Sequence, residues 1–161
     1  MKRLRERSWL LLAGVLLALV LAVVPMPALL QPLRPFWLAL LACYLVLECP
    51  EHFNTGRAFL LGLAADMVQG SLLGEHALRL VILTAVLHHL RARLRFFPPT
   101  QQALVLGGLL AADRVLVSVL HLAVGQPVPA LAGWWSVLTG MLLWPLLFVV
   151  LDRLLMGRRA R

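Results

Sequence analysis

Cysteine and histidine are scarce, and neither occurs in an arrangement that usually binds a metal. The sequence has two cysteines and five histidines among 161 residues. Cys43 and Cys49 lie in or beside one hydrophobic segment without the spacing of metal ligands, so we expect two reduced cysteines that pack as small apolar side chains. His88 and His89 are adjacent, so their rings diverge on a helix. The sequence therefore predicts no metal site.

Motifs of catalysis are also missing from the sequence. No order of serine, histidine and aspartate is recognisable for nucleophilic catalysis, and no glycine-rich loop is placed to hold phosphate. These absences argue against the common hydrolases and the nucleotide-binding enzymes. We therefore expect a protein that is not an enzyme and that has no cofactor.

Acidic residues are few. The chain has seven Asp and Glu residues against 15 Lys and Arg residues, and its formal net charge is +8. In a soluble protein this excess would suggest binding to nucleic acid or to an anionic surface. Here the basic residues gather mostly at the two ends and in one internal loop. That distribution is typical of membrane topology, so we expect no nucleic acid partner.

Hydrophobic residues dominate the sequence, at 61% of the chain and a mean hydropathy of +0.90. Apolar runs that approach the thickness of a bilayer indicate an integral membrane protein. The sequence predicts an all-α fold: one polytopic membrane domain, residues 1–161, built as a bundle of six transmembrane helices. The expected spans are approximately residues 9–26, 33–48, 58–73, 77–90, 103–124 and 134–151. The second run is short, so it either thins the bilayer or lies buried among the other helices.

The charges of the connecting loops indicate the orientation. Basic residues lie in the N-terminal segment, near Arg57, in residues 91–95 and at the C-terminal end, whereas the opposite loops hold only Arg34, with Arg79 close to one of them. By the positive-inside rule, both termini are then cytoplasmic. The loop of residues 91–95 is interpreted as a determinant of topology, with docking of anionic lipid or of an acidic partner as the alternative.

Small and polar residues share one face of the third expected span. Gly62, Asp66 and Gly70 recur at a spacing of four residues, and Gln69 lies beside that stripe. A carboxylate facing lipid would cost about 3 kcal/mol, so Asp66 is expected to point into the protein, and the glycines to let another backbone come close. Gly70 and Gly74 are then expected to end or break the helix.

Further ionisable residues interrupt the later spans. Glu75 and Arg79 are four residues apart and can pair within one helix, while Asp113 and Arg114 lie deep in the fifth span. Arg79, Asp113 and Arg114, together with the aspartate of the third span and His121, could form a proton or ion path. The alternative, which we favour, is that the third-span aspartate pairs with Arg79 or Arg114 inside a structural bundle.

Several segments of the chain resemble the MreD family of bacterial rod shape-determining membrane proteins. The sequence GLAADMVQGSLLGEHAL, residues 62–78, resembles the central signature of that family, in which a helix with Asp is followed by Gln-Gly, Leu-Gly and Ala-Leu. Residues 32–37, 93–98, 101–103 and 143–145 resemble it as well, so the similarity covers almost the whole chain. The chain departs from the family pattern at Glu75, where an uncharged polar residue is expected, and at Arg114.

The resemblance implies a non-enzymatic subunit of the elongasome in the bacterial cytoplasmic membrane. Such a subunit associates with MreC, a single-span protein with a periplasmic domain. Through MreC it is connected to the MreB filament, the glycosyltransferase RodA and a class B penicillin-binding transpeptidase. Together these proteins form the elongasome, which serves lateral peptidoglycan synthesis. The fold of the family is similar to the substrate-binding components of energy-coupling-factor vitamin transporters, which is an analogy of fold alone.

Two hypotheses follow from the residues and the resemblance together. The first is a membrane scaffold that binds MreC and helps to organise the elongasome. The second is a small-molecule binding or transport subunit, which would need a water-lined pocket. The residues expected to bind a partner or to pack the bundle are Gly62, Asp66, Gln69, Gly70, Gly74, Arg79, Asp113 and Arg114.

Overall fold

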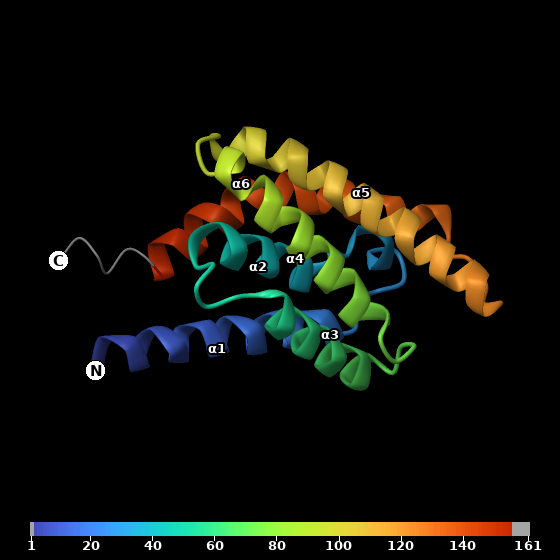
Figure 1. Ribbon diagram of the computed structural model, residues 1–161. Coiled ribbons are helices and arrows are strands. Elements are labelled where there is room, and N and C mark those ends of the chain that lie inside the picture. The colour runs from blue at the N-terminus through green and yellow to red at the C-terminus, as the bar shows by residue number, and fades with distance from the viewer. Residues whose placement is uncertain (1, 156–161) are drawn as a thin grey trace.

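The computed structural model describes the backbone of residues 2–155 and the side chains of residues 12–154. Within these residues it contains six α-helices, two short 3-10 helices and no β-strand (Figure 1). The predicted all-α class is therefore confirmed. The terminal basic side chains that helped to predict the topology, those of residues 2–7 and Arg158, Arg159 and Arg161, lie outside the described residues.

Each apolar run that was expected from the sequence lies largely within one helix. The helices are α1 (Lys2–Val23), α2 (Trp37–Glu48), α3 (Thr55–Gln69), α4 (Glu75–Leu94), α5 (Pro99–Val124) and α6 (Trp135–Leu155). The 3-10 helices are η1 (Gln31–Leu33) before α2 and η2 (Leu131–Trp134) before α6. Helix α1 ends before Pro25, since a proline disfavours helical geometry in the residue that precedes it. Among the described residues, the segments Pro99–Val124 and Leu131–Leu154 are long and apolar enough to cross a membrane.

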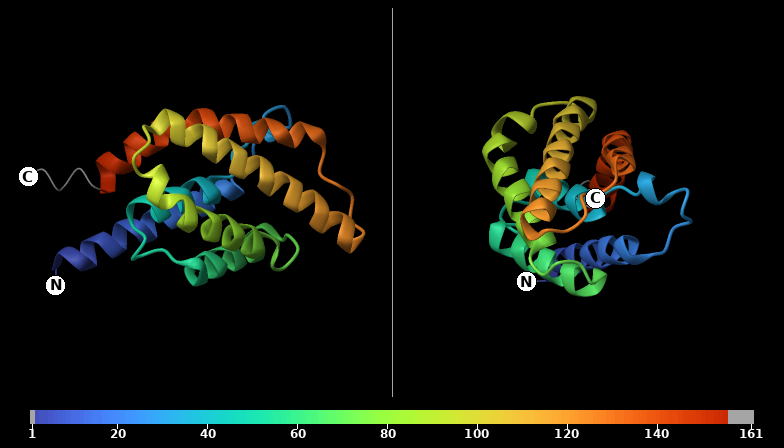
Figure 2. Two further views of the ribbon diagram at one scale, coloured as in Figure 1. Left: turned by 45° about the horizontal axis from the view of Figure 1, so that its top comes forward. Right: turned by 90° about the vertical axis from the view of Figure 1, so that its right-hand side faces the viewer.

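Helix α2 forms the centre of the bundle. It has 12 residues, and every residue from Leu38 to Leu47 is buried. It contacts α1, α4 and α6, and the end view in Figure 2 places it among its neighbours. A helix that is apolar on all sides is expected in such a position. The shortness of this run thus reflects its location inside the bundle.

Both ends of the described chain lie at the same end of the bundle. Figure 1 shows the N-terminal end of α1 and the C-terminal end of α6 on the left, together with the α2–α3 and α4–α5 connections. The α1–α2, α3–α4 and α5–α6 connections lie at the opposite end. The chain therefore alternates between the two ends of the bundle, as successive antiparallel helices do.

Large apolar side chains also cover the outside of the molecule. Leu16, Met67, Leu104 and Leu142, from four different helices, are each at least 60% exposed. Further exposed large apolar side chains lie on α1, α3, α4, α5 and α6. The helices are thus apolar toward the core and apolar toward the surroundings.

Candidate functional site

Helices α3 and α4 meet backbone to backbone at Gly62. A Cβ atom at this position would lie 2.3 Å from the Cα and 2.5 Å from the backbone nitrogen of Ala77. No side chain fits in that distance, so Gly62 is required by the close approach of the two helices. The backbone that was expected to approach this glycine is that of the next helix in the same chain.

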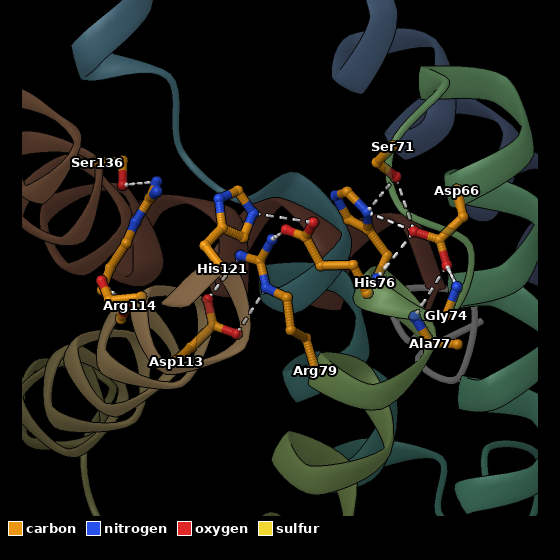
Figure 3. Close-up of polar contacts among 12 residues, drawn as sticks. Asp66, Ser71, Gly74, His76, Ala77, Arg79, Asp113, Arg114, His121 and Ser136 are labelled. Carbon is orange, nitrogen blue, oxygen red and sulfur yellow. Dashed lines mark hydrogen bonds and ion pairs between the residues drawn. The ribbon is translucent and has the colours of Figure 1, made fainter. Parts of the chain in front are cut away.

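Asp66 lies one turn further along α3 and is 1% exposed. Its carboxylate accepts hydrogen bonds from the backbone N–H groups of Gly74 and His76, both at 2.9 Å, and more distantly from Ala77 at 3.4 Å. The hydroxyl of Ser71 donates to it at 2.8 Å (Figure 3). These amides belong to the start of α4, where backbone N–H groups have no helical partner. Asp66 therefore acts as an N-terminal cap that is supplied by the preceding helix.

The two glycines of the α3–α4 turn are needed for its backbone conformation. Gly70 follows α3 with φ 64°, and Gly74 precedes α4 with φ 97°. A Cβ atom at either position would meet nothing within 4 Å, so crowding is not the reason for glycine. Positive φ angles are strained for other residues. Gln69 lies just before this turn with an exposed side chain and takes no part in the cluster around Asp66.

Ser71, His76 and Asp66 come together in space, but their geometry differs from that of a catalytic triad. Nδ1 of His76 lies 2.8 Å from the Asp66 carboxylate and 3.1 Å from the Ser71 hydroxyl. In a triad, the aspartate and the serine contact opposite nitrogens of the imidazole. Here the serine hydroxyl donates directly to the carboxylate, and the imidazole does not lie between the two as it does in a triad. The cluster orients the start of α4.

A second buried cluster joins α4 to α5. Nε of Arg79 donates to Asp113 at 2.8 Å and Nη2 donates at 2.6 Å, which makes a bidentate pair. The side chains of Arg79 and Asp113 are only 7% and 8% exposed. The guanidinium of Arg79 also lies 4.1 Å from the ring centroid of Phe36, at the start of α2. Such a pair fixes the two helices relative to each other and leaves neither charge unpaired.

This pairing corrects the one expected from the sequence. Asp66 pairs with neither Arg79 nor Arg114; it meets backbone amides and His76 instead. The carboxylate that neutralises Arg79 is Asp113, 34 residues further along the chain. Spacing along the helices could not reveal this, because α3 and α5 present their carboxylates to different parts of α4.

Glu75 and His121 extend the second cluster. Glu75 lies 3.6 Å from Arg79, as the spacing of four residues predicted, and its other oxygen lies 3.3 Å from Nε2 of His121. The second ring nitrogen of His121 lies 3.0 Å from the carbonyl of Pro127. The result is a line of side chains from Asp113 through Arg79 and Glu75 to His121, of which Figure 3 labels Asp113, Arg79 and His121.

Arg114 lies apart from this line. Its guanidinium donates to the hydroxyl of Ser136 at 2.5 Å, and that hydroxyl donates to the carbonyl of Gly133 at 2.7 Å. No carboxylate of the described side chains forms an ion pair with Arg114. Beside it is an open pocket of about 430 Å³ between the α3–α4 turn, α5 and the α5–α6 connection. The described residues contain no group of three histidine, cysteine or acidic side chains arranged to hold a metal ion.

The segments outside the central signature contact the signature and one another. Phe36 packs edge to face on His76, with 5.7 Å between the ring centroids. At the other end of the bundle, buried Gln102 donates to the carbonyls of Leu94 and Phe97, both at 3.1 Å, and accepts from the indole of Trp144 at 3.3 Å. Sequence reasoning did not single out these residues for a role. For Gln102, a signal was available in the sequence, because it is a polar residue at an apolar helix position. A buried amide needs hydrogen-bond partners, so such a residue is expected to join neighbouring segments.

The chain is similar to known proteins over nearly its whole length. The profile of the family described as rod shape-determining protein MreD matches residues 4–154. The rod shape-determining protein MreD of Haemophilus influenzae is 31% identical over 147 residues, which cover 89% of each chain. No solved structure matches the chain. Since the profile and this relative both extend over nearly its whole length, the chain belongs to the MreD family of rod shape-determining proteins, and its role lies in cell shape.

Proposed function

We propose that the chain is a membrane scaffold that binds MreC and helps to organise the elongasome for lateral peptidoglycan synthesis. In this proposal its six helices form one membrane domain of the bacterial cytoplasmic membrane, with both termini in the cytoplasm. MreB, RodA and a class B penicillin-binding transpeptidase are reached through MreC. The chain supplies binding surface and position and performs no catalysis.

The arrangement of the helix connections supports the proposed topology. The six helices run in alternating directions (Figure 1). An even number of membrane crossings would therefore return the chain to the side on which it began. Arg57 and the basic residues Arg91, Arg93 and Arg95 lie at the end that holds the two termini. The opposite connections contain Arg34, with Arg79 just inside α4. This asymmetry is the one that the positive-inside rule associates with cytoplasmic loops.

The observation that carries the proposal is the separation of polar from apolar contacts. Asp66, Arg79 and Asp113 are buried and meet partners within the chain, while the exposed faces of the helices carry leucine, valine and methionine. A bilayer favours this distribution, because unpaired charges are costly in lipid and apolar faces are not. A partner with a single transmembrane helix would meet the chain mainly through such apolar faces.

A small-molecule binding or transport subunit is the second candidate. The pocket of about 430 Å³ favours it, because the lining includes Glu75, Arg79 and His121. This volume lies within the range of small ligand sites. Against it, the ionisable side chains gather around the first turns of α4, whereas transport needs groups along a path through the bundle.

A pull-down from native membranes distinguishes the two. The tagged chain is solubilised in mild detergent, and the proteins and small molecules that remain bound are identified by mass spectrometry. The scaffold predicts recovery of MreC together with wall-synthesis enzymes, compared with a matched membrane protein carrying the same tag. Recovery of an ATPase module or of a bound small molecule without MreC would favour transport and contradict the scaffold.

A further inference from the structure

The open pocket beside Arg114 is the part of the polar region that the internal contacts do not fill. Its lining comes from the α3–α4 turn, from α4, from α5 and from the α5–α6 connection, and includes Ser71, Glu75, Arg79, Arg114 and His121. All of these elements meet at the end of the bundle opposite the two termini (Figure 1). In the proposed topology this is the periplasmic side.

Arg79 and Arg114 both line the pocket, but they differ in their partners. Arg79 is held by both oxygens of Asp113 and is further contacted by Glu75. Arg114 donates to one neutral hydroxyl, that of Ser136. A guanidinium carries five N–H donors, and one in a partly buried site normally meets an anion. Of the two arginines that line the pocket, Arg114 is the one that forms no ion pair within 4 Å; the carboxylates of Asp113 and Glu75 act on it only from further away.

We propose that Arg114 receives a carboxylate side chain of the membrane partner in this pocket, an inference that rests on the proposed function. A carboxylate matches a guanidinium in shape and makes two parallel hydrogen bonds with it. Glu75 on the pocket wall disfavours a ligand with more than one negative charge. A single carboxylate balances Arg114 without adding an unpaired charge, as Asp113 balances Arg79.

The test compares three arginine variants in the full-length chain. Arg114→Gln removes the charge but keeps a donor for Ser136, and Arg114→Lys keeps the charge but loses the bidentate geometry. Arg34→Gln is the matched control, because Arg34 is also part-buried, donates to the carbonyl of Leu21 at 2.9 Å, and lies on another connection at the same end of the bundle. The readouts are the dissociation constant for MreC in detergent and the melting temperature of the chain alone.

The proposal predicts that Arg114→Gln weakens MreC binding by about tenfold or more, because it leaves a partner carboxylate unpaired. Arg114→Lys is expected to weaken it less, and Arg34→Gln to leave it unchanged. The melting temperature should stay near that of the wild type for all three variants. A charge swap should identify the partner group. In a further variant, Arg114→Glu, MreC binding should be lost, and it should be restored when the acidic residue of MreC that contacts this position is replaced by arginine.

Three results would overturn the proposal. The first is equal MreC binding by the wild type and Arg114→Gln. The second is an anionic phospholipid that native mass spectrometry finds on the wild type and not on Arg114→Gln while MreC binding persists, which would assign the pocket to a lipid phosphate. The third is a fall in the melting temperature of Arg114→Gln, which would make Arg114 structural. Failure of the wild type to bind MreC would instead contradict the proposed function itself.

Discussion

At the scale of single residues, the signature segment is explained by hydrogen bonds and close contacts inside the chain. Asp66 is a carboxylate in an apolar helix, and it satisfies three backbone amides at the start of the next helix. A residue of this kind stabilises the fold at the place where two helices turn. The sequence predicted that Asp66 points inward. It could not identify the backbone N–H groups that donate to the carboxylate, because these lie beyond a turn that contains two glycines.

The cap predicts a specific order of stability. Asp66→Leu leaves the buried amide of His76 and the part-buried amide of Gly74 without an acceptor, at a cost of about 2 kcal/mol or more. For a chain of this size, that corresponds to a melting temperature lower by roughly 4 to 8 °C. Asp66→Asn keeps one acceptor oxygen and should fall between Asp66→Leu and the wild type. The melting temperature in detergent measures this, with exposed Glu51→Gln as the control, and an unchanged value for Asp66→Leu would contradict the cap.

Gln102 gives a second residue-scale prediction. Gln102→Leu removes the donor to the carbonyls of Leu94 and Phe97, so the α4–α5 connection loses its attachment. The Leu94 carbonyl keeps the N–H of Phe97 as a donor, so the loss is that of the Gln102 hydrogen bonds, about 1 to 1.4 kcal/mol, and local opening should become about fivefold to tenfold more frequent. Limited trypsin digestion at exposed Arg95 should therefore be faster. Gln101→Leu, at the exposed neighbouring position, is the control; equal digestion of both variants would refute the attachment.

At the scale of elements, the α3–α4 pair is the unit that the signature builds. Its limits were predictable, since Gly70 and Gly74 end one helix and precede the other. Its internal contact was not predictable, because a small residue on a helix face fits a partner protein and a neighbouring helix equally well. The short α2 is similar: the sequence left open whether it is a thin span or a buried helix, and the burial of both of its faces follows from tertiary packing.

The close approach of α3 and α4 predicts a sharp difference between two glycines. Gly62→Val places a side chain within 2.3 Å of the α4 backbone, so the helices must separate, at a cost of about 3 kcal/mol or more. Gly108→Val, in the middle of α5, meets nothing within 4 Å and should be tolerated. Protein level and the monodisperse fraction in detergent report the outcome. If Gly62→Val accumulated as well as Gly108→Val, the two helices could not be packed in this way.

At the scale of the whole molecule, the apolar exterior and the alternation of the helices point to a membrane bundle. Hydropathy and charge predicted the helices and their order. They could not predict which charges pair, because Arg79 and Asp113 are 34 residues apart and meet only when α4 and α5 pack. The pocket beside Arg114 likewise arises from four elements that converge at one end.

The proposed topology predicts which positions face the periplasm. In a variant with Cys43 and Cys49 replaced by alanine, single cysteines at the exposed positions Leu30 and Val128, in the α1–α2 and α5–α6 connections, should react with a membrane-impermeant maleimide in intact spheroplasts. A cysteine at Arg95 should react only after permeabilisation. Labelling of the Arg95 position from outside would contradict cytoplasmic termini, and the permeabilised sample controls for burial of each site.

The central claim is that Gly62 and Asp66, the buried residues of the signature helix, build the bundle and do not touch the partner. The most direct test is the amount of MreC bound per monodisperse molecule of the Asp66→Asn variant, compared with the wild type at matched concentration. Because Asp66 is 1% exposed, the account predicts a lower yield of folded variant but the same MreC ratio per folded molecule. A lower ratio at an unchanged melting temperature would mean that Asp66 contacts the partner, and would contradict the account.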